Sequence, residues 1–298
     1  GLFQAMGLSK KILQDIIDPG TVLGPLTADV AAATGFRDVP VVATAGHDTA
    51  AAVAAVPAEG ADWVYISSGT WSLVGVETKT PIISPRSLES NFTNEGGVGG
   101  TIRFLKNVTG LWLVQGCRKA WAADGAATYQ ELAAAAANAP PFAAFVDPDD
   151  PAFLNPSDMP EAIAGYFRKT GQAPPGSRAQ LVRSLLESLA LKYRVVIEEL
   201  GSILERPVER IHIIGGGSRN DLLCQFTADA TGLPVVAGPA EATAIGNILV
   251  QAMALGQVSS PAEIRAIIRD SFEPRTFEPS GKAAWDAAYG LFREVLAV

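Results

Sequence analysis

The sequence predicts an α/β fold in which a mixed sheet is flanked by helices. From Trp63 onward, apolar runs with strand-like composition come first, and they are followed by segments whose apolar residues recur at helical spacing. The composition supplies the core that such a fold needs, since 48% of the 298 residues are hydrophobic and only 18% are charged. This length allows one large domain or two modest ones.

The first part of the chain contains turn signals, short strands and short helices. The expected elements are a helix from about Thr27, a strand near 39–44, a helix over 48–56, strands over 63–67, 71–76 and 101–105, and a helix over 111–121. The strands at 63–67 and 71–76 are separated by a turn that contains Gly69. We therefore expect them to pair as a hairpin.

The second part alternates helices with short strands after an irregular segment. Residues 139–175 are rich in Pro, Asp and Gly, and we expect an insertion there with a short helix near 161–170. Its acidic residues Asp147, Asp149 and Asp150 lack the spacing of a calcium loop, so we interpret the segment as a solvated loop. The elements expected after it are a helix over 177–205 with Ser177 as N-cap, a strand over 211–214, a helix over 221–231, a strand over 235–236, and helices over 241–255 and 282–296.

Three strands followed by alternating helices and strands are the element order of a ribonuclease H-like lobe of the actin and hexokinase type. Such ATPase lobes occur in pairs, with nucleotide and acceptor bound in the cleft between them. Only about forty residues precede the strand near 39–44 that leads into this lobe, too few for a second lobe. We expect residues 41–298 to form one such lobe and residues 1–40 to be the tail of the other.

Charge and cysteine usage restrict the partners. The formal net charge is -8, with 23 Lys and Arg against 31 Asp and Glu and no basic block, so we expect no nucleic acid partner. No apolar run is long enough to cross a membrane, and we expect no membrane partner. Cys117 and Cys224 lack the spacing of a disulfide framework or a zinc site, which predicts a cytoplasmic location and no metal held by the protein alone.

Asp48 follows an apolar run and starts an Ala-rich helix, so it looks like a buried carboxylate. One interpretation is a helix N-cap, which contributes about 1 kcal/mol. The other is a general base that accepts a proton from a hydroxyl group. The adjacent His47 is interpreted either as a sugar contact or as a local packing residue.

Two glycine-containing turns also have two interpretations each. The turn at Gly69 and Thr70 is either an ordinary hairpin turn or a loop whose N–H groups and hydroxyl hold phosphates. The segment Gly215–Asn220 is either a tight strand-to-helix connection or a place where the backbone approaches a ligand closely. The latter segment matches neither the dinucleotide fingerprint nor a Walker loop.

In this order and spacing, the motifs resemble those of the FGGY carbohydrate kinases, and the similarity covers nearly the whole chain. The segments that carry it are 19–21, 45–53, 67–73, 93–97, 103–113, 215–220 and 241–247. Two of these, Asn94-Glu95-Gly96-Gly97 and the Leu-Lys-Asn-x-x-Gly-Leu-Trp segment at 105–112, resemble the branch of the family that acts on L-rhamnulose more than the wider family.

The resemblance implies a reaction and a role for each matching residue. The γ-phosphoryl group of ATP, bound with Mg²⁺, would be transferred to the 1-hydroxyl of L-rhamnulose to give L-rhamnulose 1-phosphate. The implied ketose-binding residues are His47, Asp48, Thr49 and Asn107, of which Asp48 is the catalytic proton acceptor. The implied ATP-binding residues are Gly69, Thr70, Gln115, Gly216 and Asn220, with Thr70 on the phosphates and the last two beside the adenosine.

The family pattern also includes an N-terminal lobe with an Asp-x-Gly phosphate loop, which has no counterpart in this sequence. We therefore expect this chain to be the C-terminal portion of a longer kinase, with the absent lobe as its partner and with low activity alone. The alternatives are a family member acting on L-fuculose or a pentulose, and a non-catalytic nucleotide- or sugar-binding lobe. The oligomeric state stays open, a homo-oligomer included.

Overall fold

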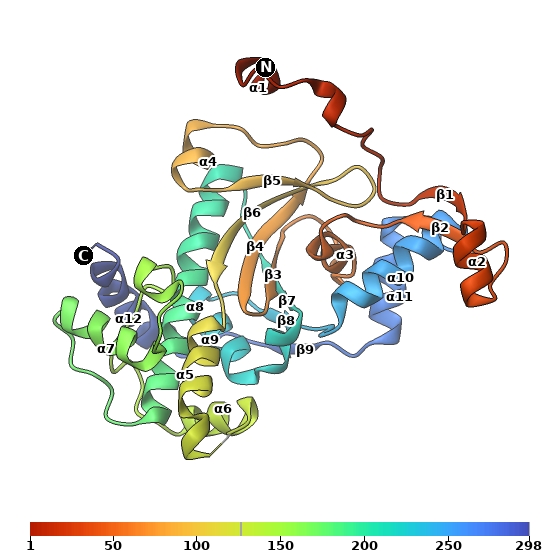
Figure 1. Cartoon of the computed structure of the whole chain (residues 1–298). Helices are drawn as coiled ribbons and strands as arrows, with labels where there is room; N and C mark the ends of the chain where they lie inside the picture. The colour runs from red at the N-terminus through yellow and green to blue at the C-terminus, as the bar shows by residue number, and fades with distance from the viewer. Residues whose placement is uncertain (126, 298) are drawn as a thin grey trace.

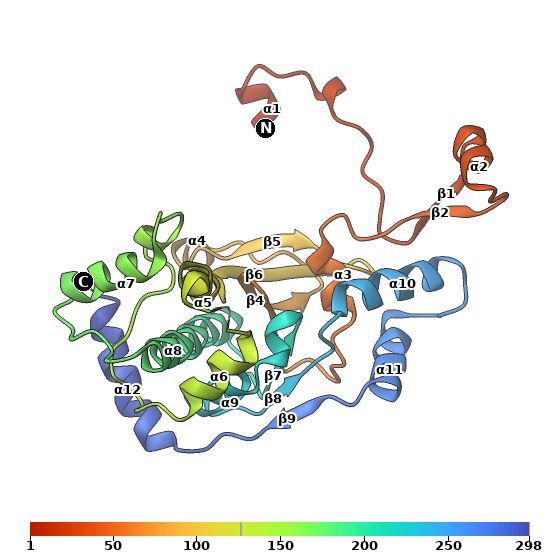
Figure 2. The same cartoon turned by 60° about the horizontal axis from the view of Figure 1, so that its bottom comes forward.

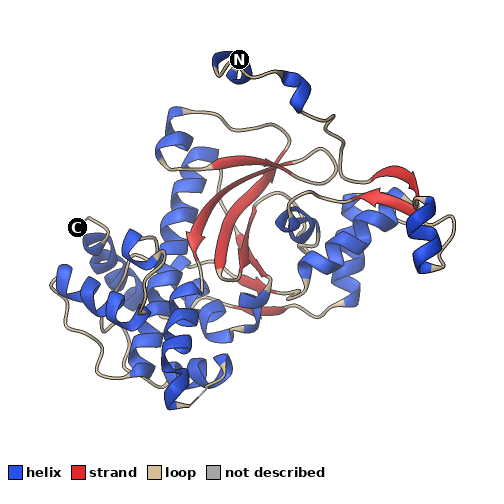
Figure 3. Cartoon of the chain, in the orientation of Figure 1, coloured by secondary structure: helices blue, strands red, loops and turns tan. Residues whose placement is uncertain are grey.

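The predicted mixed sheet with flanking helices is confirmed. The computed structural model of the chain describes residues 1–125 and 127–297, and in this part the main sheet has seven strands with helices on both faces (Figures 1 and 3). The strands, in spatial order, are β5 (Thr93–Gly96), β6 (Ile102–Thr109), β4 (Trp71–Thr78), β3 (Trp63–Ser68), β7 (Arg210–Ile214), β8 (Val235–Ala237) and β9 (Arg275–Phe277). The central strands β3, β7 and β8 are parallel, and the pairs outside them are antiparallel.

Each face of the sheet has its own hydrophobic core, because successive side chains of a strand point to opposite faces. Val64 and Ile66 of β3 belong to the larger core, whereas Trp63 and Tyr65 belong to the smaller one. The larger core contains side chains of α5 (Trp112–Ala120), α6 (Tyr129–Ala137), α7 (Met159–Lys169), α8 (Arg178–Leu204), α9 (Asp221–Thr231) and α12 (Lys282–Val295). The smaller core contains side chains of α3 (Asp48–Ala54), α10 (Ala242–Ala254) and α11 (Pro261–Ser271).

Helix α8 is the central element of the larger core, as Figure 2 shows. It extends over 27 residues and begins after Ser177, whose hydroxyl accepts a hydrogen bond from the backbone N–H of Gln180 at 3.1 Å. Its apolar residues recur at helical spacing along nearly the whole length and are buried. The predicted helix and its N-cap are therefore confirmed.

The first 48 residues, all of them described by the structure, contain no buried residue. The segment starts with α1 (Leu2–Ala5) and the short 3₁₀ helix η1 (Lys10–Ile12). Strand β1 (Thr21–Pro25) then pairs antiparallel with β2 (Pro40–Ala43), and α2 (Ala28–Thr34) is part of the connection between the two strands. Figure 2 shows this segment extending from the body of the molecule. The boundary expected at residue 40 therefore falls at the start of a strand that pairs with the preceding tail.

Several elements were not predicted. They are α1, β1, α4 (Pro85–Glu89), β5, α6, α11, β9 and the 3₁₀ helices η1, η2 (Trp121–Asp124), η3 (Pro151–Phe153) and η4 (Gly216–Arg219). Two of these helices had a readable start signal, since Thr128 with Glu131 forms a capping box at α6 and Ser260 caps α11 with Glu263 three residues later. The strand expected at 101–105 also continues to Thr109.

The interpretation of the acidic segment as a solvated loop is wrong. Asp147 and Asp149 lie 2.7 Å and 3.0 Å from the ammonium group of Lys192 on α8, and only 10% of that lysine side chain is exposed. Asp150 instead caps η3 by accepting a hydrogen bond from the N–H of Ala152. The segment is anchored because a buried cation needs carboxylate partners.

Helices α3 and α10 pack so closely that only glycine fits at the crossing. A Cβ atom on Gly246 would overlap the backbone carbonyl oxygen of Ala51, and backbone atoms cannot rotate away as a side chain can. The small residues of α3, buried from Thr49 to Ala54, allow this approach. The start of α3, which carries Asp48, is therefore held by a contact more than 190 residues away in the sequence.

We expect Gly246→Ala to lower the free energy of unfolding by about 1–3 kcal/mol, because the added methyl group forces the two helices apart. The matched control is Gly290→Ala on α12, where a Cβ would meet no atom within 4 Å and helix propensity favours alanine by up to about 1 kcal/mol. Urea denaturation of both variants tests this. Equal stability of the two would contradict the packing argument.

His212 of β7 is a buried core residue. It is 3% exposed, and its ring contacts the Trp63 ring edge to face at a centroid distance of 5.9 Å. Burial lowers the pKa of His212 to about 3, and the positive charges of Arg210 and Arg265 act in the same direction. The folded protein therefore holds this ring neutral.

Stability should fall in acid because of His212. In the unfolded chain this ring takes up a proton near pH 6.5, whereas in the folded chain it does so only near pH 3. The contribution of the neutral ring to the free energy of unfolding is therefore full above pH 6.5 and is lost as the pH falls from 6.5 to 3. Between pH 6.5 and pH 4.5 the wild type should lose about 2 kcal/mol more than His212→Phe. Denaturant titrations at both pH values measure this difference, and parallel losses would disprove it.

Candidate active site

The hairpin turn between β3 and β4 is fixed by the backbone of the loop between β6 and α5. The N–H groups of Gly110 and Leu111 donate to the carbonyl oxygens of Thr70 and Gly69 at 3.0 Å and 2.9 Å. The hydroxyl of Thr70 stays on the surface and donates to the side-chain oxygen of Gln115 at 3.0 Å. The predicted hairpin is confirmed, and two of the predicted ATP-binding residues contact each other.

Glycines enclose this turn on both sides. A Cβ on Gly110 would lie 2.6 Å from the hydroxyl oxygen of Ser72 and 2.8 Å from the carbonyl oxygen of Gly69. On the other side, a Cβ on Gly215 would lie 2.9 Å from the carbonyl oxygen of Ser68, and one on Gly217 would overlap the Ser68 side chain. Any larger residue at these positions would displace the turn.

The Gly215–Asn220 segment is a tight connection and also borders a cavity, so the two interpretations are compatible. It forms η4, and the Asn220 side chain caps α9 by accepting a hydrogen bond from the N–H of Leu223 at 3.1 Å. Arg275 of β9 holds the same segment from outside, since its guanidinium donates to the carbonyl oxygen of Ser218 at 2.6 Å and pairs with Asp221.

A cavity of about 990 Å³ lies between the turn, η4, α6 and α9, and it contains four of the five predicted ATP-binding residues: Gly69, Gln115, Gly216 and Asn220. The fifth, Thr70, is hydrogen-bonded to Gln115. Helix α6, which was not predicted, provides a further wall of this cavity. Its Tyr129 lines the cavity and lies under the guanidinium of Arg118, 4.7 Å from the ring centroid. The capping box at Thr128 was the signal that could have revealed this helix.

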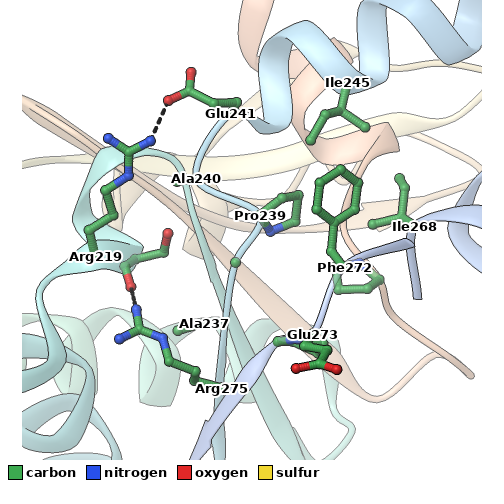
Figure 4. A pocket seen from close by; sticks show the side chains of 14 residues that line it. Arg219, Ala237, Pro239, Ala240, Glu241, Ile245, Ile268, Phe272, Glu273 and Arg275 are labelled. Atoms are coloured by element: carbon green, nitrogen blue, oxygen red, sulfur yellow. Dashed lines mark hydrogen bonds and ion pairs between the residues drawn. The ribbon is translucent and has the colours of Figure 1, made fainter. Parts of the chain in front are cut away.

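A second, smaller cavity of about 330 Å³ lies on the other side of η4, next to α10 and α11 (Figure 4). Its floor is apolar, with Pro239, Ile245 and Phe272 among the lining residues. Arg219 and Arg275 line both cavities, and Figure 4 shows Arg219 turned toward Glu241, with which it pairs at 2.7 Å. None of the predicted site residues lines this second cavity.

The capping interpretation of Asp48 is wrong. His47 is the N-cap residue and makes no capping hydrogen bond with its side chain, and Asp48 is the first residue of α3. The Asp48 side chain is also not buried, since 76% of it is exposed. Helix α3 is buried from Thr49 onward, so only its first residue, Asp48, lies in solvent.

The surroundings of Asp48 leave its carboxylate available. The Thr49 hydroxyl lies 3.4 Å from one carboxylate oxygen, and Nδ1 of His47 lies 3.9 Å from the same oxygen. In the described part of the chain no backbone N–H group donates to this carboxylate. A free, exposed carboxylate at the start of a rigid helix fits a proton acceptor better than a helix cap.

The predicted sugar-binding residues and ATP-binding residues lie on opposite faces of the sheet. Asn107 of β6 is exposed and is the cross-strand partner of Leu73, which packs against the core of the α3 face. Asn107 therefore lies on the same face as α3. The large cavity is lined by Val182 and Leu186 of α8 on the other face. In the part of the chain that the structure describes, no hydrogen bond joins Asn107 to residues 47–49.

The Asn94–Gly97 segment holds the edge of the sheet. The Asn94 side chain exchanges two hydrogen bonds of 2.8 Å with the backbone of Ile82. Arg103, only 1% exposed, donates to Glu95 at 2.7 Å and to the carbonyl oxygen of Gly96 at 3.1 Å. This segment therefore anchors β5 on β6.

Both cysteines are buried and unpaired, and burial raises the pKa of each thiol to about 12. Within residues 1–125 and 127–297, no three or more His, Cys, Asp or Glu side chains gather where they could hold a metal ion. No helix among these residues has both the length and the apolar character needed to cross a membrane.

Comparison with known families and curated proteins identifies the relatives of this chain. Residues 64–255 match the model of the FGGY family of carbohydrate kinases, C-terminal domain. The chain is 51% identical over 292 residues to a rhamnulokinase of Bacteroides thetaiotaomicron, covering 98% of this chain and 60% of that protein. It is 43% identical over 278 residues to a rhamnulokinase of Bacillus subtilis, covering 93% of this chain and 57% of that protein. The chain thus spans about 60% of the length of these relatives.

Solved structures share the fold. A xylulose kinase from Rhodospirillum rubrum superposes with a TM-score of 0.72 at 23% identity, over 99% of this chain and 59% of that one. A Plasmodium falciparum glycerol kinase with ADP gives a TM-score of 0.75 at 11% identity, over 99% of this chain and 58% of that one. These neighbours support the actin and hexokinase type of fold. Because the family model matches more than half of the residues, the chain belongs to the FGGY family of carbohydrate kinases.

Proposed function

We propose that this chain is the C-terminal lobe of an ATP-dependent kinase that phosphorylates the 1-hydroxyl of L-rhamnulose. The observation that carries the proposal is that four of the predicted ATP-binding residues line one cavity. The fifth, Thr70, is hydrogen-bonded to Gln115, which is one of the four. The name of the relatives at 43–51% identity supports the choice of sugar. The free, buried thiols of Cys117 and Cys224 favour a reducing compartment such as the cytosol.

The large cavity fits a nucleotide in size and chemistry. Its volume of about 990 Å³ lies at the upper end of the range for small-molecule sites. At Gly216 a Cβ would meet no atom within 4 Å, so the backbone there faces open space that a ligand can approach. We assign Gly216 and Asn220 to the adenosine, and Gly69, Thr70 and Gln115 to the phosphates.

Mg²⁺ suits this site as a companion of ATP, because it is usually held by substrate phosphates with one or two carboxylates. When bound, it would offset phosphate charge that a protein of net charge -8 does not neutralise by itself. Among the described residues that line the cavity, Asp221 carries a carboxylate, but that group is paired with Arg275, so the phosphates of ATP would be the main ligands of the ion.

In the proposed reaction, Asp48 accepts the proton of the 1-hydroxyl while that oxygen bonds to the γ-phosphorus. The bond between the γ-phosphorus and the bridging oxygen breaks, and ADP leaves with that oxygen. His47, Thr49 and Asn107 would orient the ketose on the α3 face. The Gly69–Thr70 turn, where the two faces of the sheet meet, would hold the phosphoryl group between donor and acceptor.

We further propose that residues 1–40 are the tail of a second lobe and that residues 41–298 form the lobe described here. Apolar side chains of the tail are exposed, with Ile16 at 98%, Leu2 at 80% and Phe36 at 64%. Such a concentration of exposed apolar residues favours a partner that covers them. The second lobe would complete the charge stabilisation of the transferred phosphoryl group, so we expect low turnover without it.

One prediction of the proposed function concerns nucleotide binding by this chain. We expect it to bind MgADP, and Thr70→Val to weaken binding by about 10- to 150-fold, because a hydrogen bond to a charged phosphate contributes about 1.5–3 kcal/mol. Thr80→Val, an exposed threonine outside the cavity, serves as the control and should bind as the wild type does. Isothermal titration calorimetry measures all three. Absence of binding by the wild type at millimolar MgADP would refute the nucleotide site.

Another prediction of the proposed function concerns the proton acceptor and is tested in the full-length kinase. Asp48→Asn should lower kcat by about 10²–10⁴-fold, the usual contribution of a general base, with the MgATP affinity unchanged. Asp29→Asn, on the exposed helix α2, is the control. A coupled assay for ADP release with L-rhamnulose, L-fuculose and D-xylulose also tests the sugar assignment. Near-normal turnover by Asp48→Asn would rule out this role.

A further inference from the structure

Asp149, in the acidic segment of the insertion at 139–175, makes contacts that play no part in the proposed reaction. Asp149 is bound on one side by Lys192, whose ammonium group lies 3.0 Å from Oδ2. Burial lowers the pKa of Lys192, but Asp149 and Asp147 more than compensate, and the pKa lies above its ordinary value. Lys192 is therefore charged, and it fixes the orientation of the Asp149 carboxylate.

The other oxygen of Asp149 binds the end of strand β6. Oδ1 accepts a hydrogen bond from the backbone N–H of Thr109 at 2.7 Å. Strand β5 pairs with β6 only as far as Leu105, so no strand of residues 1–125 and 127–297 covers that edge of β6 at Thr109. The carboxylate takes the place of a strand carbonyl and completes the hydrogen bonding of a partly buried backbone group.

The residues directly after Thr109 hold the turn. Gly110 and Leu111 donate to the carbonyl oxygens of Thr70 and Gly69, and the tight contact at Gly110 leaves no room for adjustment. The same insertion also fixes the start of α5, because the Trp112 indole N–H donates to the carbonyl oxygen of Phe153 at 2.8 Å. A displacement of Thr109 would therefore move the turn as well.

We propose that Asp149, oriented by Lys192, is a positioning residue for the turn formed by Gly69 and Thr70. It holds the end of β6 and thereby places the Thr70 hydroxyl. This inference rests on the proposed function for what the turn binds. A loop anchor alone would not require a bond to β6. Asp150 provides the comparison, since it anchors the same loop through Ala152 and Lys169 and, among the described residues, makes no hydrogen bond to β6.

The test compares Asp149→Ala with Asp149→Asn and Asp150→Ala. Two readouts are used: the Kd for MgADP, and the hydrogen exchange rates of the Gly110 and Leu111 amides. Asp149→Ala should raise the Kd by about tenfold or more and speed exchange at both amides by a similar factor, which corresponds to losing about 1.4 kcal/mol. Asp149→Asn keeps the acceptor oxygen and should stay within about threefold of the wild type. Asp150→Ala should change neither readout.

If Asp149→Ala does not fold, Lys192→Met removes the charge that orients Asp149 while leaving the Asp149 carboxylate in place. It should raise the Kd and both exchange rates by at least about threefold. A folded Asp149→Ala with unchanged Kd and exchange would overturn the proposal, as would an equal response of Asp150→Ala. Failure of the wild type to bind MgADP would instead overturn the proposed function, because the exchange readout needs no ligand.

Discussion

The structure depends on the close approach of three backbone segments at the β3–β4 turn. The turn lies between Gly110 on one side and Gly215 with Gly217 on the other, at distances that exclude a Cβ atom. Because protein interiors are close-packed, such contacts transmit displacement rather than absorb it. These contacts therefore fix the relative positions of three features, which behave as one unit: the Thr70 hydroxyl, the large cavity and the end of β6.

Under the proposed function, this unit accounts for how one lobe can serve two ligands. Alternating side chains give the sheet two faces, with α3, Asp48 and Asn107 on one and the large cavity on the other. Under the proposed function, the turn is the place where a group bound on one face comes within reach of the other. Under the proposed function, phosphoryl transfer occurs across the end of the sheet, and the rigid turn supplies the alignment that this reaction requires.

Aspartates of this chain take different roles because of their surroundings. Asp149 lies beside a buried cation and a backbone N–H group, so both of its oxygens are engaged. Asp48 is exposed, and no backbone N–H group within the described residues engages its carboxylate. The first is suited to holding a structure in place, and the second to exchanging a proton. Residue type and local sequence do not distinguish these cases.

The sequence by itself determined the order of the main elements and the family motifs, because apolar periodicity and turn residues are local signals. It predicted α8 with its N-cap, and through the family resemblance it predicted four of the residues that line the large cavity. Only the tertiary structure decided that Asp48 is no cap, that α6 forms a cavity wall, and that Asp149 joins Lys192 to β6. Those outcomes depend on burial and on contacts between residues far apart in the chain, which no local pattern encodes.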